Sequence, residues 1–248
     1  MLSDVKKIIA IASGKGGVGK STVTANLAMA AALSGKEVGV LDADLYGPSM
    51  GLMFGINEEP VIYKDNTMLP FFSHGIKIAT VAKLLPAEKA NAWRGPRAAA
   101  FIKNLLNFVH WESLDVLFID MPPGTGDVQL SVIQECTLNG AIMVSTPQVV
   151  ALADCIKGID LFVETNVPIL GLVENMSSFV CDCGKEHFIF GNGGAQNVAE
   201  KMGIPLLGQI PIESSLMEGG EQGLPAVLAN PNSKSAKIFA QIADKCLI

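Results

Sequence analysis

The chain has 248 residues, of which 49% are hydrophobic and 17% are charged, and its formal net charge is -6. This length and apolar content predict one large domain with a sizeable core, and the acidic balance leaves no basic face that would favour nucleic acid as a partner. The first apolar run is too short for a secretory signal and none reaches the length of a membrane span, so we expect a cytoplasmic protein that binds no membrane.

Apolar, strand-like runs recur along the chain, with segments of helical length between most of them. These runs occupy residues 8–12, 38–41, 116–119, 141–145, 169–174 and 206–210. Their alternation with helices predicts an α/β fold, in which helices cover both faces of a mainly parallel sheet. Residues 61–82 instead combine short strands with turn residues and predict a small lobe beside the sheet. No linker is evident, so we expect a single domain over residues 1–248.

The first strand-like run leads into the stretch GKGGVGKST at residues 14–22. Its glycines and the following Lys-Ser pair satisfy the phosphate-loop pattern G-x-x-x-x-G-K-S/T, and a helical stretch follows from about residue 20. In such a loop the backbone N–H groups surround the phosphates of a nucleotide. We therefore predict a nucleotide site at Gly14, Gly16, Gly17, Val18, Gly19, Lys20, Ser21 and Thr22.

Individual side chains of this loop have separate expected roles. Lys20 should reach the β- and γ-phosphates as a catalytic residue, Ser21 should bind Mg²⁺ through its hydroxyl, and Thr22 should lie near the α-phosphate. Lys15, directly after the first glycine, is not required by the pattern. From the local sequence alone, Lys15 adds positive charge to its own loop.

A pair of carboxylates follows the strand-like run at residues 38–41, where ligand sites of open α/β sheets collect. Asp44 is the better candidate for positioning the water that attacks the nucleotide. Asp42, one peptide closer to the strand, is expected to support the region of Mg²⁺ and Lys20. The alternative is a solvated turn at the end of a strand, because Asp is common in such turns.

The stretch LFIDMPPGTGD at residues 117–127 supplies a further acidic residue at the end of a strand. Asp120 is predicted to bind Mg²⁺ through a water molecule. Gly124 is predicted to turn its N–H toward the γ-phosphate, which would make this loop sensitive to the presence of that phosphate. Asp127 precedes a helical segment and is expected to be its N-cap.

ATP is the expected nucleotide, because the chain lacks the N-K-x-D signature that guanine-binding phosphate-loop proteins generally carry. Asn175, after the run at residues 169–174, is a candidate for pairing with the adenine edge. A turn asparagine is the alternative interpretation.

Five cysteines are present, and a disulfide framework is not expected in a reducing compartment. Cys136, Cys155 and Cys246 are interpreted as small buried residues without chemistry. Cys181 and Cys183 instead lie together in a predicted insertion near residues 176–191, between a strand and a helical segment.

The sequence GKGGVGKST, with a lysine directly after the first glycine, resembles the deviant Walker A motif of the superfamily that includes MinD/ParA, ArsA and the nitrogenase iron protein. The resemblance implies a dimer that sandwiches nucleotide. It also implies a catalytic role for Lys15, which would reach the phosphates bound by the partner chain.

Within that superfamily, five stretches together resemble the Mrp/ApbC family of iron-sulfur cluster carrier ATPases over nearly the whole chain. They are DADLYGPSMGLMFG, WRGPRAAAFIKNLL, LFIDMPPGTGDVQLS, STPQVVALADCIKGI and GLVENMSSFVCDCGKEHFIFG. The resemblance implies a homodimer that hydrolyses ATP and holds a 4Fe-4S cluster between its chains. It further implies that cluster donors and apo iron-sulfur proteins are partners.

Cys181 and Cys183 form a C-x-C pair where members of that family usually carry C-x-x-C. Two thiolates fill half of a four-ligand cluster site, and a two-fold dimer would supply the same two residues again. The alternatives are a zinc site with His187 as third ligand, or two exposed thiols without a metal.

The alternative function is a positioning ATPase of the MinD/ParA type, which would need an amphipathic membrane tail or a basic DNA-binding face. The C-terminal residues 233–248 have three lysines and apolar positions at helical spacing. We interpret this stretch as a helix that packs on its own domain.

Overall fold

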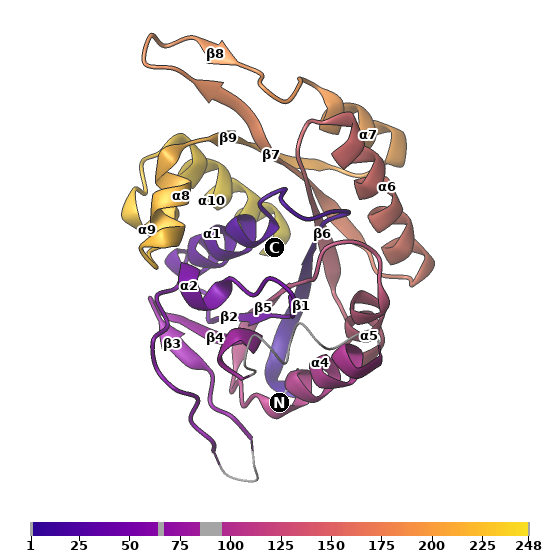
Figure 1. The fold of residues 1–248 in the computed structure, drawn as a ribbon, viewed down its shortest axis with the longest axis vertical. Helices are drawn as coiled ribbons and strands as arrows, with labels where there is room; N and C mark the ends of the chain where they lie inside the picture. Colours follow the sequence, from indigo (N-terminus) through magenta and orange to yellow (C-terminus); the bar gives the residue numbers. More distant parts are fainter. Residues whose placement is uncertain (1, 64–66, 85–95, 248) are drawn as a thin grey trace.

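The computed structural model describes residues 2–63, 67–84 and 96–247 and contains one central sheet (Figure 1). The strands are β1 (Val5–Ala12), β2 (Val38–Asp42), β3 (Phe71–Ser73), β4 (Ile76–Thr80), β5 (Leu114–Asp120), β6 (Gly140–Ser145), β7 (Ile169–Val180), β8 (Glu186–His187) and β9 (Leu206–Ile212). They are ordered β3-β4-β2-β5-β1-β6-β7-β8, and β9 also pairs with β7.

The sheet is mainly parallel, as predicted. Neighbouring strands from β4 to β7 pair in parallel and β9 adds parallel to β7, whereas β3 and β8 pair antiparallel at the two ends. Every residue of β2 and β6 is buried. Such uninterrupted burial is expected of parallel strands that have helices on both faces.

Helices cover both faces of this sheet, which confirms the predicted fold class. They are α1 (Lys20–Leu33), α2 (Met50–Met53), α4 (Pro96–Phe108), α5 (Asp127–Glu135), α6 (Val149–Glu164), α7 (Gly194–Met202), α8 (Ser214–Glu221), α9 (Ala226–Ala229) and α10 (Lys234–Leu247), with short 3-10 turns η1 (Leu2–Asp4) and η3 (Val81–Lys83). One core cluster joins the sheet to α1, α2, α8, α9 and α10, and a second joins it to α4–α7 (Figure 1).

The C-terminal helix α10 packs on its own domain, as the sequence predicted. Its buried positions include Ala236, Phe239, Ile242, Ala243 and Cys246, a spacing that places them on one face of a helix. This face packs against α1 and β9. The apolar surface of α10 is therefore already used, unlike that of a free membrane tail.

The prediction of a separate lobe at residues 61–82 was wrong for the second half of this segment. Strand β4 pairs in parallel with β2 from Val38↔Ile76 to Asp42↔Thr80 and is largely buried, so it belongs to the central sheet. The alternating apolar residues of β4 pack on both core clusters, which a separate lobe would not allow.

Strand β7 is longer than predicted, because it continues past residue 174 to Val180. The continuation is irregular: Met176 has a positive φ of 57°, and the register with β9 shifts between Asn175 and Phe179. The predicted insertion is therefore the extended end of β7 together with the short strand β8. Figure 1 shows this β7–β8 hairpin projecting from one end of the molecule.

Two further observations concern the chain as a whole. No helix within the described residues combines the length and the apolar character that crossing a membrane requires. The family-like stretch WRGPRAAAFIKNLL at residues 93–106 lies partly outside the described residues, and α4 begins at Pro96.

Candidate functional site

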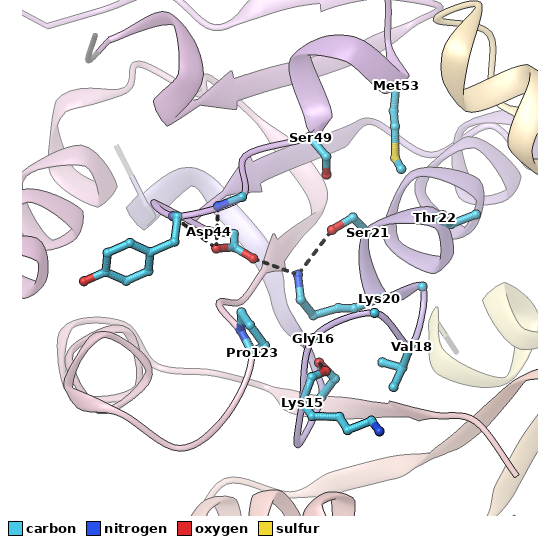
Figure 2. Close-up of a pocket in the computed structure, with 15 residues that line it drawn as sticks. Lys15, Gly16, Val18, Lys20, Ser21, Thr22, Asp44, Ser49, Met53 and Pro123 are labelled. Atoms are coloured by element: carbon cyan, nitrogen blue, oxygen red, sulfur yellow. Dashed lines mark hydrogen bonds and ion pairs between the residues drawn. The ribbon is translucent and has the colours of Figure 1, made fainter. Parts of the chain in front are cut away.

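A cavity of about 490 Å³ lies at the carboxyl ends of the central strands, where the phosphate loop connects β1 to α1 (Figure 2). It is bounded by residues 13–22, by the segment from Asp44 to Met53 after β2, and by Pro123 after β5. Three consecutive neighbours in the sheet, β2, β5 and β1, thus each contribute a loop. This placement is the expected ligand position in an open α/β sheet.

The predicted glycines shape the phosphate loop in two ways. Gly17 and Gly19 have φ values of 82° and 80°, in the left-handed region that favours glycine. Gly14 is required by packing instead, because a Cβ at this position would lie 2.1 Å from the backbone carbon of Asp154 in α6. The loop therefore has a fixed backbone before any ligand binds.

Lys20 lies at the centre of the charged network in this cavity, and its side chain is only 6% exposed. Its Nζ is 2.8 Å from Asp120 Oδ2 and 3.9 Å from Asp44 Oδ2. The Ser21 hydroxyl donates to the same Asp120 Oδ2 at 2.7 Å. The structure thus brings Lys20, Ser21 and Asp120 together as predicted, although they come from two separate motifs.

Sequence reasoning missed Thr24, whose hydroxyl donates to Asp120 Oδ1 at 2.6 Å. Both oxygens of the fully buried Asp120 are therefore occupied by groups of α1. The available signal was the spacing, because Lys20 and Thr24 are four residues apart and share one face of the helix.

Asp44 presents one carboxylate oxygen to the cavity. Its Oδ1 accepts from the backbone N–H groups of Tyr46 and Gly47 at 3.3 and 3.2 Å, while Oδ2 faces Lys20 (Figure 2). Burial raises the pKa of Asp44, against the lowering effect of Lys20. A fixed carboxylate with an affinity for protons suits the predicted role of orienting water.

Asp42 shapes the backbone around Asp44 rather than facing the cavity. Its Oδ2 accepts from the N–H groups of Ser49 and Met50, each at 3.1 Å, and from the Thr80 hydroxyl at 3.0 Å. Burial, followed by repulsion from Asp120, raises its pKa to about 7. The predicted supporting position near Lys20 is consistent with this arrangement, but its immediate contact is the start of α2.

One of the two predictions for the loop after β5 needs correction. The Gly124 N–H donates to the Ser13 carbonyl at 3.0 Å in this structure, and its turn toward a γ-phosphate stays a prediction. Asp127 is the first residue of α5, and Gly126 is the N-cap. The predicted cap was therefore one residue off, although a carboxylate in the first turn still interacts favourably with the helix dipole.

Asn175 supports the phosphate loop. Its Nδ2 donates to the Val18 carbonyl at 2.9 Å, and a Cβ on Gly19 would lie 2.1 Å from the same nitrogen. Asn175 also lines a second cavity of about 480 Å³ next to Gly19 and Thr22. The role at an adenine edge stays a prediction, with Nδ2 engaged by the loop.

The second cavity was not predicted. Besides Asn175 it is lined by residues of α2, of the end of β9, of the following residue and of α8, including Met53, Pro211, Glu213 and Met217. The only signal in the sequence was its position after the last predicted strand, because Pro211 and Glu213 belong to no recognised motif.

Lys15 lines the phosphate-loop cavity but points away from Lys20 and Asp44, as Figure 2 shows. The ammonium groups of the two loop lysines therefore lie on different sides of the loop. This orientation leaves the predicted action on a partner chain open.

The predicted cysteine pair lies at the tip of the β7–β8 hairpin. The Cys181 N–H donates to the Lys185 carbonyl, and the Gly184 N–H donates to the Cys181 carbonyl. Hydrogen bonds from Cys183 and then His187 to the Cys181 sulfur lower its pKa to about 6. Such a thiol is readily ionised to the thiolate that binds metals.

The other three cysteines, Cys136, Cys155 and Cys246, are buried, as expected. Cys183 of the hairpin pair is exposed. Burial raises the pKa of Cys136 and of Cys155 to about 12. Across the part of the chain that the structure describes, no three His, Cys, Asp or Glu side chains are arranged to hold a metal ion. The Cys-Cys-His alternative for zinc therefore gains no support from the single chain.

Comparison with known proteins gives relatives whose names all refer to iron transfer or to iron-sulfur proteins. The ParA model described as NUBPL iron-transfer P-loop NTPase matches residues 4–247. The iron-sulfur protein required for NADH dehydrogenase of Arabidopsis thaliana mitochondria is 47% identical over 98% of this chain and 78% of that protein. The iron-sulfur cluster carrier protein of Salmonella typhimurium is 46% identical over 98% of this chain and 67% of that protein.

A solved structure shares the fold. The nucleotide-binding protein of Archaeoglobus fulgidus in complex with ADP has a TM-score of 0.82 and 39% sequence identity, and the match covers 96% of this chain and 93% of that one. The fold and the phosphate-loop site are therefore those of a nucleotide-binding protein, and the relatives favour the carrier interpretation over the positioning ATPase.

Proposed function

The chain belongs to the family of NUBPL iron-transfer P-loop NTPases, and on this premise we propose that it hydrolyses ATP and carries a 4Fe-4S cluster between two copies of itself for delivery to apo-proteins. The observation that carries the proposal is the presence of two sites in one chain. One is the network of Lys20, Ser21 and Asp120 in the phosphate loop, and the other is the accessible Cys181–Cys183 pair.

The two neighbouring cavities divide the expected nucleotide. Phosphates would occupy the cavity lined by the loop, whose backbone N–H groups and Lys20 supply positive charge. The second cavity begins at Thr22, where the α-phosphate is expected, and leads along Asn175 toward Pro211 and Glu213. Its mainly apolar lining suits a base and ribose, which supports ATP as the ligand.

Oxygen donors at the phosphate loop fit a magnesium ion. Ser21 and Asp120 present a hydroxyl and a carboxylate within 2.7 Å of each other, and Mg²⁺ prefers such ligands. The ion would neutralise charge on the phosphates when bound. Lys20 would exchange its contact with Asp120 for the β- and γ-phosphates, which would free Asp120 to hold a metal-bound water.

The remaining charged residues have roles in hydrolysis. Asp44 holds an oxygen toward the cavity and would orient the attacking water. Lys15 points away from its own Lys20, so we assign it to the phosphates of the partner chain. Each active site would then need two chains.

The hairpin would hold the cluster. Cys181 and Cys183 provide two thiolates, and a two-fold axis would add the same pair from a second copy. Apolar side chains flank the pair, since Phe179, Val180, Phe188 and Ile189 are all exposed by more than a third of their surface. Contact between two hairpins would cover this surface together with the cluster.

Anaerobic reconstitution with iron and sulfide tests the proposal. We expect about four irons per dimer, with broad visible absorption, and a dimer by size-exclusion chromatography. Cys181→Ser should lose the cluster while MgATP binding persists, because the phosphate loop lies elsewhere on the sheet.

Cys246→Ser is the matched control, because Cys246 is a buried cysteine of α10 and should retain the cluster. A monomer that holds four irons would contradict the bridging arrangement. Tight zinc binding without iron uptake would instead support the Cys-Cys-His site.

A further inference from the structure

The hydroxyl of Ser49, a residue that lines the phosphate-loop cavity, is buried and has no hydrogen-bond partner. A buried hydroxyl without a partner is costly, and such groups are uncommon in folded proteins. Ser49 lines the cavity directly. The position therefore suggests a partner that comes with the ligand.

The usual structural role of this serine is filled by another residue. Ser49 is the N-cap of α2, where a serine hydroxyl normally accepts from backbone N–H groups of the first turn. Here the hydroxyl makes no such bond, and Asp42 accepts from the N–H groups of Ser49 and Met50 instead. The carboxylate fixes the backbone and leaves the hydroxyl without a structural function.

The direction of the side chain relates it to the nucleotide. Figure 2 shows the Ser49 hydroxyl pointing into the cavity, on the side where the Ser21 hydroxyl and the Lys20 ammonium lie. Ser49 comes from the segment after β2 and faces the phosphate loop across the cavity. Phosphates held within the loop itself would lie closer to residues 14–22, so Ser49 faces the end of the nucleotide that extends beyond the loop.

We propose that Ser49 binds the terminal phosphate of ATP, with its bound magnesium, and so distinguishes ATP from ADP. The inference rests on the proposed function, because it assumes that MgATP occupies this cavity. The hydroxyl would donate to a phosphate oxygen or to a metal-bound water at the same end of the ligand. Ser49 is thus an additional binding residue, contributed by the segment between β2 and α2 rather than by the phosphate loop.

The contact would also affect Asp44. The backbone N–H groups of Asp44 and Ser49 both donate to the Asp42 carboxylate, which holds the two residues in one segment. A ligand that engages Ser49 would fix this segment at a second point. Asp44 would then be positioned best when the terminal phosphate is present.

Calorimetry on Ser49→Ala tests the inference, with a non-hydrolysable ATP analogue and with ADP, both in the presence of Mg²⁺. We expect the affinity for the analogue to fall about tenfold, as for a lost hydrogen bond to a charged group. The affinity for ADP should change less than about twofold. The thermal unfolding temperature of the nucleotide-free variant should not decrease, because the hydroxyl has no hydrogen-bond partner to lose.

Ser235→Ala is the matched control, because the Ser235 hydroxyl in α10 is also buried and unpartnered but lines neither cavity. It should leave both affinities unchanged. Equal losses for the analogue and ADP, or no loss for either, would overturn the assignment of Ser49. Lower stability of nucleotide-free Ser49→Ala would also overturn it. Failure of the unmodified protein to bind any nucleotide would reject the proposed function itself.

Discussion

One ammonium group and three buried carboxylates dominate the site at the scale of single residues. Lys20 contacts Asp120 directly and lies 3.9 Å from Asp44, while Asp42 is fully buried behind them. Burial of Asp42, at the end of β2, and of Asp44, just after it, raises the pKa of each. Carboxylates of the same local sequence thus have different tasks, because their hydrogen-bond donors differ.

Asp44→Asn should separate binding from hydrolysis. The amide retains an oxygen for the Tyr46 and Gly47 N–H groups, so MgATP affinity should change little. Hydrolysis should fall about a hundredfold or more, because a group that orients or deprotonates water acts chiefly in the transition state. Calorimetry and phosphate release measure the two effects, and Asp127→Asn on the exposed start of α5 is the control. Lower affinity with normal turnover would move the role of Asp44 to binding.

Stability should depend on pH through Asp42. Its pKa is about 7 in the folded protein and 3.8 ordinarily, so the folded state retains the proton over that interval. The contribution to stability is therefore present at low pH and is lost as the pH rises toward 7. Urea unfolding without nucleotide should show that Asp42→Asn costs more stability at pH 5 than at pH 8. A cost that is independent of pH would show that Asp42 is ionised throughout.

The roles of individual residues were only partly predictable from the sequence. Lys20 and Ser21 follow from a local pattern, because a phosphate loop is continuous in the chain. The task of Asp42 depends on Thr80, and that of Asn175 depends on Val18, which lies 157 residues away. Such contacts are set by tertiary packing, so no spacing in the sequence revealed them.

At the scale of elements, the phosphate loop depends on backbone shape and on its contact with β7. Gly19→Ala should abolish measurable nucleotide binding, because its Cβ would meet Asn175 Nδ2 and its φ is 80°. Gly35→Ala is the control, since Gly35 has a φ of 84° but nothing lies within 4 Å of the added Cβ. Both variants should lose about 1 kcal/mol of stability from the backbone strain. Normal ATP affinity of Gly19→Ala would show that Asn175 can move without consequence.

The ends of the sheet were the elements least accessible from the sequence. Apolar runs revealed the buried central strands, because both of their faces lie in the core. The irregular end of β7 was not predicted, since the positive φ of Met176 and the register shift interrupt the simple alternation of a strand. The place of β4 in the central sheet was not predicted for a related reason. Turn residues surround this strand, and only its pairing with β2 places it in the sheet.

At the scale of the whole molecule, the proposed dimer would use two surfaces at different places. Lys15 lies at the phosphate-loop cavity, and the cysteine hairpin projects from one end of the fold (Figure 1). In a dimer that uses both surfaces, the nucleotide bound at the phosphate loop would influence the contact between the two hairpins that hold the cluster. Whether Lys15 acts on its own chain or on the partner is the point on which this arrangement depends.

Mixed dimers test that point. Lys15→Ala should preserve folding, because the side chain is half-buried at the cavity edge, but should impair hydrolysis by removing a positive charge from the partner's phosphates. Asp44→Asn should be inactive for a different reason, since it lacks the residue that orients water. When the two variants are mixed, one site of each heterodimer combines an intact Asp44 with an intact Lys15 from the partner. Phosphate release should therefore recover in proportion to the heterodimer, and heterodimers that are formed but inactive would place Lys15 in its own loop.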